Sequence, residues 1–292
     1  MSGGRCGVAS SDVVVPICRT ERADGTRPFV VEFVGTPGSG KTTLALRLVA
    51  ILRRHGVAAD TVVGGARDHI ARTRAGRVIR VVPGARMRSL LQWWAFYAFA
   101  TARAIRFAAA HRALTREVIA SQVARRLPLR RRVHVLYWFF QLCGRYDLLF
   151  VTSRRGEVLV VDDGFLHRAV TLHASHAERP TAESVQRYLD LVPPPDVAVL
   201  TIAPSDVCRD RVLARGVWRH SRKLTAPEIG RALSNAELAA DLAVAYARRR
   251  GWIVVGVENG GRTFDRVESD LSRVVAHCLA GVAPRECGGS GT

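Results

Sequence analysis

Five short apolar runs, separated by segments with helical spacing, predict the fold class of this chain. The runs contain mostly β-branched and aromatic residues, which is typical of strands that are buried on both faces. They are residues 29–34, 59–63, 157–162, 197–202 and 252–257. Because helical segments separate consecutive strands, the pattern predicts an α/β fold: a five-stranded parallel sheet with helices on both faces.

A long, mostly helical insertion is predicted after the second strand, over residues 64–156. Its helical candidates lie near 87–110, 112–127 and 131–150. An insertion of this size usually determines specificity rather than fold. We therefore expect it to shape a substrate pocket, with Trp93 and Trp94 in the pocket wall.

The two ends of the chain differ in composition from the rest. Residues 1–27 are rich in Gly and Ser and are expected to form a flexible leader. Residues 284–292 end in Gly-Gly-Ser-Gly-Thr and are expected to be a disordered tail. There is no internal repeat, and residues 28–283 are predicted to form one domain.

A phosphate-binding loop is predicted between the first strand and the helix that follows it. The octet matches the Walker A pattern G-x-x-x-x-G-K-[ST] in the required strand–loop–helix context. Its residues are Gly35, Thr36, Pro37, Gly38, Ser39, Gly40, Lys41 and Thr42, and Thr43 comes next. Glycines allow close backbone approach, and the inward N–H groups and the helix N-terminus attract phosphate. We expect Lys41 to reach the β and γ phosphates of ATP and Thr42 to ligate Mg²⁺.

Net charge favours an anionic partner, but the type of basic residue weakens that inference. The chain has a formal net charge of +19 and a pI near 11.2. Of its 44 basic residues, 42 are Arg, and the lysines are Lys41 and Lys223. Such a scarcity of lysine indicates compositional bias, with arginines spread over the surface. A nucleic-acid partner is therefore possible but not favoured.

Two adjacent carboxylates follow the third predicted strand, in Asp162-Asp163-Gly164. A phosphate-binding loop needs an acidic partner for Mg²⁺ at the end of a neighbouring buried strand. One of the pair is expected to hold the Mg²⁺ or its water, and the other could accept a proton from an attacking hydroxyl. The sequence does not decide between the two assignments.

Cysteine and histidine spacing gives no metal or disulfide pattern. The six cysteines include no C-x-x-C pair, and His167, His173 and His176 match no usual ligand spacing. The N-terminus lacks the apolar core of a signal peptide. A reducing cytoplasm is therefore the expected compartment.

The most hydrophobic stretch of the chain is residues 90–102. It is shorter than the roughly 20 apolar residues that span a bilayer, so no transmembrane segment is expected. A buried helix is the favoured interpretation. A wall of a substrate pocket and a helix lying on a membrane surface are the alternatives.

The chain resembles the P-loop nucleoside and nucleotide kinases, the relatives of thymidylate and adenylate kinase. The phosphate-binding loop is the specific motif. The stretch 163–168, Asp-Gly-Phe-Leu-His-Arg, is similar to the Asp-Gly-Phe-Pro-Arg of adenylate kinases, and Asp162 matches the acid of the Asp-Arg pair in thymidylate and deoxynucleoside kinases. The resemblance covers residues 29–56, 157–168 and 197–260.

The resemblance implies a lid over residues 209–225, where an Arg-x-x-x-Arg stretch follows the fourth strand. Arg211 and Arg215 share a helix face, and with Arg219 they would neutralise the charge that develops on the transferring phosphoryl group. The resemblance also makes Asn259, after the fifth strand, a candidate adenine contact; an ordinary turn is the alternative.

These features predict an ATP- and Mg²⁺-dependent phosphotransferase that moves the γ-phosphate to a small-molecule acceptor. The acceptor would be a nucleoside, a nucleotide or a sugar-like hydroxyl compound. The first alternative is a P-loop NTPase that couples ATP hydrolysis to a nucleic-acid or protein partner. The second is a nucleotide-binding module without turnover that uses residues 90–107 at a membrane.

Overall fold

The computed structural model describes residues 27–125, 127–153, 156–215, 224–260 and 264–282. The predicted tail and all but the last residue of the predicted leader lie outside the described residues. So does the part of the predicted lid between residues 216 and 223.

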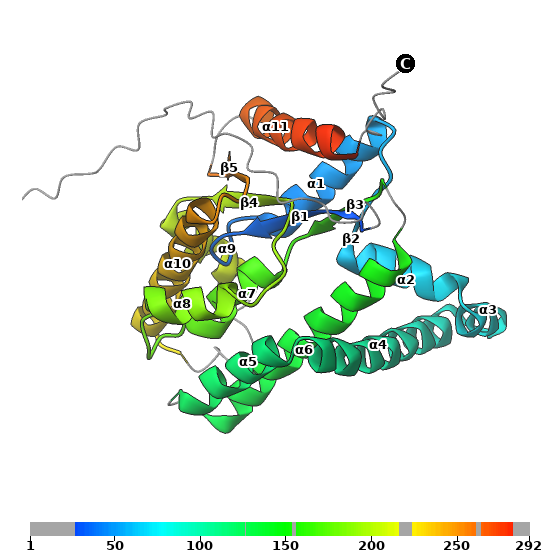
Figure 1. Ribbon diagram of the computed structural model, residues 1–292, viewed down its shortest axis with the longest axis horizontal. Helices are drawn as coiled ribbons and strands as arrows, with labels where there is room; N and C mark the ends of the chain where they lie inside the picture. Colours follow the sequence, from blue (N-terminus) through cyan, green and yellow to red (C-terminus); the bar gives the residue numbers. More distant parts are fainter. Residues whose placement is uncertain (1–26, 126, 154–155, 216–223, 261–263, 283–292) are drawn as a thin grey trace, which may run out of the picture.

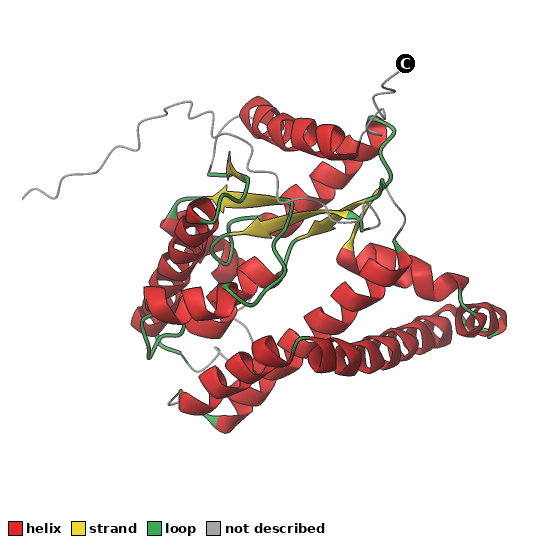
Figure 2. Cartoon of the chain, in the orientation of Figure 1, coloured by secondary structure: helices red, strands yellow, loops and turns green. Residues whose placement is uncertain are grey.

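A single parallel sheet forms the centre of the described structure (Figures 1 and 2). The strands are β1 (Phe29–Val34), β2 (Ala59–Thr61), β3 (Val158–Val161), β4 (Val197–Ile202) and β5 (Val254–Glu258). Their order is β2-β3-β1-β4-β5, and every neighbouring pair is parallel. The predicted fold class is confirmed, and it is the one that the resemblance to P-loop nucleoside and nucleotide kinases implies.

The predicted bounds of three strands were wrong. Strand β2 ends at Thr61 instead of residue 63, because the Thr61 hydroxyl accepts a hydrogen bond from the Gly64 N–H at 3.1 Å and begins helix α2 (Val62–Arg72). Strand β5 begins at Val254 instead of residue 252, and the Trp252 ring packs edge-on against Tyr246 at 5.8 Å. Strand β3 is shorter than predicted by one residue at each end, which leaves Asp162 beyond its carboxyl end.

Helices cover both faces of the sheet (Figure 1). Helices α1 (Lys41–Arg54) and α11 (Phe264–Val282) pack on the face to which Phe29, Val31 and Phe33 of β1 point. The opposite face is covered by α7 (Phe165–His173), α8 (Ala182–Leu189) and α10 (Ala226–Arg249), and α9 (Ser205–Ala214) follows β4. Burial of the sheet on both faces explains why its strands are apolar along their whole length.

The insertion contains five helices among the described residues. They are α2, α3 (Arg74–Val81), α4 (Ala85–Ala110), α5 (Arg112–Ala124) and α6 (Leu129–Thr152). The three helices expected there correspond to α4, α5 and α6, whereas α2 and α3 were not predicted. A side chain at Gly144 of α6 would overlap the Ala100 backbone of α4, so these two long helices pack closely where they cross.

The hydrophobic stretch 90–102 lies in α4 and is only half buried. Phe96 and Ala100 are 2% and 0% exposed, whereas Leu90 and Trp94 are 55% and 73% exposed. The interpretation as a buried helix is therefore wrong for one face of α4. Over the ranges that the structure describes, none of the helices combines the length and the apolar character needed to cross a bilayer.

Candidate active site

The phosphate-binding loop has the backbone shape that its glycines predict. Gly38 and Gly40 adopt φ angles of 88° and 96°, a region that disfavours residues with a Cβ. A Cβ at Gly38 would overlap the Cys208 carbonyl group, and one at Gly40 would overlap the Asn259 side chain. The loop is therefore enclosed on its outer side by the segments that follow β4 and β5.

Lys41, the first residue of α1, lies across the loop. Its Nζ donates hydrogen bonds to the carbonyl oxygens of Gly35 at 2.9 Å and Thr36 at 3.1 Å. Burial lowers the pKa of Lys41 to about 8, and the nearby Asp163 and Asp162 carboxylates act in the opposite direction. Lys41 is half-buried in the loop, where a bound phosphate would interact with its ammonium group more strongly than in bulk water.

The two adjacent carboxylates have different partners. Asp162 accepts a hydrogen bond from the Thr42 hydroxyl at 2.8 Å, which joins the end of β3 to the start of α1. Asp163 forms an ion pair with Arg168, with its Oδ2 2.7 Å from Nη2, and its Oδ1 is 3.9 Å from Nε2 of His167. The structure therefore distinguishes the two carboxylates, which the sequence alone does not. Asp162 contacts the start of α1 next to the phosphate-binding loop, and Asp163 contacts the start of α7.

Sequence reasoning missed Glu32, which is 2% exposed in the middle of β1. Its carboxylate lies at the N-terminus of α7, where Oε1 accepts a hydrogen bond from the His167 N–H at 3.0 Å. Burial raises the pKa of Glu32 from 4.5 to about 8, while the N–H groups of His167 and Leu166 act to lower it. A Cβ at Gly164 would overlap this carboxyl group. Glu32 therefore fixes the segment that presents Asp163 and Arg168.

Arg168 was also not predicted as a site residue, although it lies in the stretch that resembles adenylate kinases. Its side chain is 9% exposed, and its Nε, like Oδ1 of Asp163, is buried without a hydrogen-bond partner. Arg145 of α6 likewise has a buried, unpartnered Nε, and its guanidinium lies over the rings of Phe96 and Trp138 at 5.0 Å and 5.9 Å. Burial lowers the pKa of Arg145, with Asp163 among the groups that act in the opposite direction.

Arg211 and Asn259, predicted as a phosphate contact and an adenine contact, both bind the phosphate-binding loop itself. Arg211 donates hydrogen bonds to the carbonyl oxygens of Gly38 at 3.2 Å and Asn259 at 3.3 Å. The Asn259 amide donates to the Ser39 carbonyl oxygen at 2.6 Å. In this structure their side chains brace the outer side of the loop.

Of the other two predicted arginines, the structure describes Arg215 but not Arg219. Arg215 is exposed at the end of α9, near enough to Lys41 to contribute to the lowering of its pKa. Arg219 lies outside the described residues.

The predicted tryptophans do not share one environment. Trp93 packs against Phe96 at 5.8 Å and Tyr97 at 5.7 Å, on the side of α4 that faces α6 and Arg145. Trp94 is 73% exposed, so the structure does not place it in a pocket wall.

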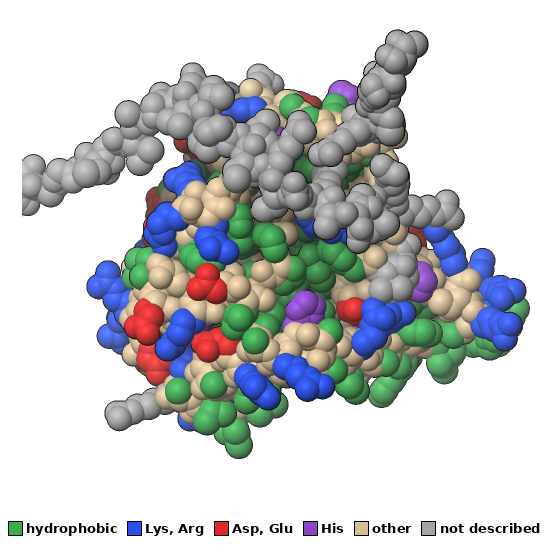
Figure 3. Space-filling model, viewed as in Figure 1, with side chains coloured by type: hydrophobic (Ala, Val, Ile, Leu, Met, Phe, Trp, Pro, Cys, Tyr) green, Lys and Arg blue, Asp and Glu red, His purple; other side chains and the backbone are tan. Residues whose placement is uncertain are grey.

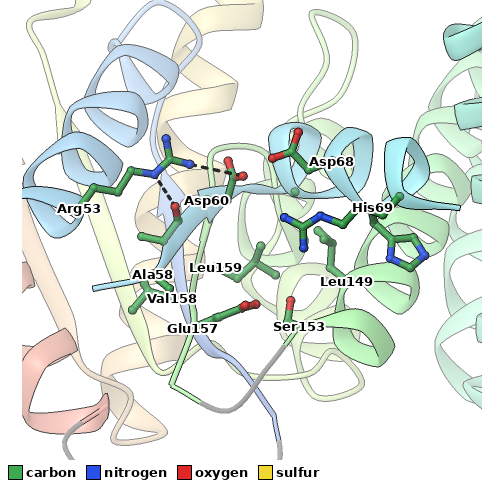
Figure 4. Close-up of a pocket in the computed structure, with 13 residues that line it drawn as sticks. Arg53, Ala58, Asp60, Asp68, His69, Leu149, Ser153, Glu157, Val158 and Leu159 are labelled. Atoms are coloured by element: carbon green, nitrogen blue, oxygen red, sulfur yellow. Dashed lines mark hydrogen bonds and ion pairs between the residues drawn. The ribbon is translucent and has the colours of Figure 1, made fainter. Parts of the chain in front are cut away.

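A pocket of about 320 Å³ lies away from this site (Figure 4). It opens at the amino ends of β2 and β3, beside Ala59 and Val158, whereas the phosphate-binding loop follows the carboxyl end of β1. Arg53 contributes to its lining and donates a hydrogen bond to the Ala59 carbonyl oxygen at 2.8 Å. Its Nη2 is also 3.4 Å from Oδ2 of Asp60. The pocket is therefore not part of the candidate active site.

No cluster of three or more His, Cys, Asp or Glu suitable for a metal ion occurs within the described ranges. His167 and His173 are buried, and burial lowers the pKa of both imidazoles, to about 4 for His173.

Comparison with known proteins gives limited information. No protein-family model and no curated protein matches the chain. Among solved structures, the chain is similar to a deoxyadenosine kinase from M. mycoides with bound dCTP, at 11% sequence identity and a TM-score of 0.38; the match covers 85% of this chain and 100% of that chain. A likeness at this level concerns the fold at most, so we infer the function from the residues of the site.

Proposed function

We propose that this protein is an ATP- and Mg²⁺-dependent phosphotransferase that moves the γ-phosphate of ATP to a small acceptor with a hydroxyl group. The observation that supports this most directly is the contact between Thr42 and Asp162. It joins a Walker A loop to a carboxylate at the end of the adjacent strand, the arrangement that P-loop enzymes use to hold nucleotide and metal.

The donor side consists of the loop amides, Lys41 and the metal ligands. Lys41 exchanges the carbonyl oxygens of Gly35 and Thr36 for phosphate oxygens when ATP binds. Thr42 and Asp162 offer a hydroxyl and a carboxylate oxygen 2.8 Å apart, and oxygen ligands are those that Mg²⁺ prefers. When bound, Mg²⁺ would neutralise phosphate charge, and these two residues would hold it directly or through water.

The acceptor side consists of Asp163, Arg168 and Arg145. Asp163 is held by Arg168 through Oδ2, which leaves Oδ1 able to accept the proton of an attacking hydroxyl. The unpartnered Nε groups of Arg168 and Arg145 are donors for oxygen atoms of the acceptor or of the phosphoryl group. The partly exposed ring of Trp138, beside Arg145, suits a planar acceptor such as a nucleoside.

Further polar residues have supporting roles in this proposal. Arg215, exposed at the end of α9, would add positive charge near the phosphates, a role that the sequence also predicts for Arg219, whereas Arg211 and Asn259 keep the loop in its binding shape.

The test is an acceptor screen with labelled ATP that covers nucleosides, nucleoside monophosphates and sugars. Wild-type protein is expected to phosphorylate one of these classes, and Lys41→Ala to lose the transfer while it keeps its secondary structure and its unfolding transition. Full transfer by folded Lys41→Ala, or ATP hydrolysis that no acceptor stimulates, would refute the proposal.

The two carboxylates are distinguished by a second experiment. Asp162→Asn is expected to raise the Mg²⁺ concentration needed for half-maximal rate, in common with Thr42→Ala. Asp163→Asn is expected to lower kcat by 10²-fold or more at unchanged Mg²⁺ dependence, on the order of what a general base contributes. Identical behaviour of the two Asn variants would remove the assignment.

A further inference from the structure

The positive charge of the chain is concentrated in the helical insertion. Residues 64–156 contain 19 of the 44 basic residues, all Arg, and three of the 25 acidic residues, Asp68, Glu117 and Asp147. Their formal net charge is therefore +16, and the remainder of the chain is nearly balanced. Compositional bias alone does not explain this distribution, because it would not remove acidic residues from one segment.

The same segment has an exposed row of large apolar side chains on α4, which we call the apolar stripe: Met87, Leu90, Trp94 and Ile105. The first three are spaced three and four residues apart and share one face of the helix, and Ile105 lies on that face three turns further on. Their exposed fractions are 52%, 55%, 73% and 68%. Val78 and Val81 of α3, immediately before α4, are 65% and 80% exposed. In Figure 3 hydrophobic side chains protrude along the lower margin of the molecule, over α4.

Exposed arginines flank the stripe where α3 meets α4. Residues 69–116 contain no Asp or Glu. The exposed arginines nearest the stripe in sequence are Arg74, Arg77, Arg80, Arg86 and Arg88. Basic side chains therefore gather at the α3 end of the molecule in Figure 3, beside the hydrophobic margin. An apolar face with a Trp and a basic border is the pattern of helices that lie in a membrane interface.

We infer that the α3–α4 face binds the surface of a membrane that contains anionic lipids. The stripe would enter the boundary between headgroups and acyl chains, while the bordering arginines contact lipid phosphates. A two-fold contact with a second copy would bring the same arginines of both chains together, which like-charge repulsion disfavours. A nucleic-acid backbone would match the arginines but would leave the aliphatic side chains of the stripe without an apolar partner.

The inference does not depend on the proposed phosphotransfer. The stripe contains none of the residues of the candidate active site, and the opposite side of α4 bears Phe96, over which Arg145 lies. Membrane binding can therefore be measured without nucleotide, and failure of one proposal leaves the other unaffected.

The experiment is flotation of the full-length protein with vesicles at about 0.15 M salt, a concentration that screens distant charges. Vesicles of phosphatidylcholine alone are compared with vesicles that contain roughly 30% phosphatidylglycerol. Wild-type protein is expected to float with the anionic vesicles only. The double variant Leu90→Glu/Trp94→Glu should bind at least about tenfold more weakly, because two apolar side chains lose their burial. Arg86→Glu/Arg88→Glu should also bind at least about tenfold more weakly, since each basic residue near an anionic surface contributes about fivefold.

Leu46→Glu is the matched control, because Leu46 is 57% exposed on α1, outside the insertion. It is expected to float like the wild type. Flotation of all these proteins to the same extent would overturn the inference, as would failure of wild-type protein to float with anionic vesicles. Light scattering that shows a wild-type dimer converted to monomer by Leu90→Glu/Trp94→Glu, without vesicle binding, would assign the face to a second copy.

A second measurement needs no substitution. Lipids with brominated acyl chains quench tryptophan fluorescence at the depth of the interface, so anionic vesicles with such lipids are expected to quench wild-type protein. Absence of quenching would overturn the inference even if the Glu variants failed to fold. Equal or stronger binding to single-stranded RNA than to anionic vesicles would also overturn it.

Discussion

The buried carboxyl group of Glu32 makes the stability of this protein depend on pH in a direction opposite to that of most carboxylates. Folding takes the Glu32 side chain from water to a buried position in the middle of β1, where its pKa is about 8 rather than 4.5. The two values differ by about 3.5, and each unit corresponds to about 1.4 kcal/mol, so ionised Glu32 costs the folded state about 5 kcal/mol relative to the protonated form. The cost is absent below pH 4.5, grows as the pH rises, and is complete above about pH 8.

Glu32→Gln removes the ionisation but keeps an oxygen that can accept the hydrogen bond from the His167 N–H. The substitution is therefore expected to change little at pH 5 and to stabilise the protein increasingly as the pH rises. From the same pKa values, the difference in unfolding free energy between variant and wild type should change by about 4 kcal/mol between pH 5 and pH 8.5. Urea unfolding at several pH values, followed by circular dichroism, measures this difference.

Glu183→Gln is the control, because the Glu183 side chain is 80% exposed on α8. Its difference from wild type should stay within about 0.5 kcal/mol at every pH. A pH-independent difference for Glu32→Gln would show that the carboxyl group titrates near its usual pKa and would refute the reasoning.

Three further predictions concern the phosphate-binding loop. ATP affinity should fall about tenfold per pH unit above pH 8, because Lys41 has a pKa of about 8 before phosphate binds and a higher one afterwards; calorimetry that gives equal Kd values at pH 7.5 and 9.5 would contradict this. Gly40→Ala should weaken ATP binding more than tenfold, whereas Gly56→Ala, with a similar φ of 75° but open space around it, should cost about 1 kcal/mol of stability and leave ATP affinity unchanged. Arg211→Ala should raise the KM for ATP by about tenfold through the loss of two hydrogen bonds to the loop region, with a smaller effect on kcat; a fall in kcat at unchanged KM would place Arg211 at the transferring phosphate instead.

The sheet could be predicted from the sequence because each strand is buried on both faces and is therefore apolar without interruption. The same rule should have drawn attention to Glu32, the charged residue in Phe29–Val34, because an ionisable group in a doubly buried strand needs a specific partner. The partner lies 135 residues away in the chain, at the start of α7, which no local pattern reveals.

The α4 helix was misjudged because hydrophobicity was equated with burial. Its sequence contains two apolar faces. One, with Phe96, Ala100 and Phe107, packs in the interior, and the other, with Leu90 and Trp94, faces outward. The helical period places residues 90 and 94 on one face and 96 and 100 on another, so the two could be separated by spacing. Which of the two faces is buried depends on the crossing with α6, and that was not predictable from the segment alone.

The contacts that enclose the phosphate-binding loop have a consequence for how the protein becomes active during its synthesis. The octet is complete near the beginning of the chain, but its outer side is held by Arg211 and by Asn259. A chain that has emerged from the ribosome only as far as β4 already contains every Walker A residue and still lacks Asn259. On the proposed function, such a nascent chain is expected not to retain ATP, so nucleotide capture would be one of the last properties that the growing polypeptide acquires.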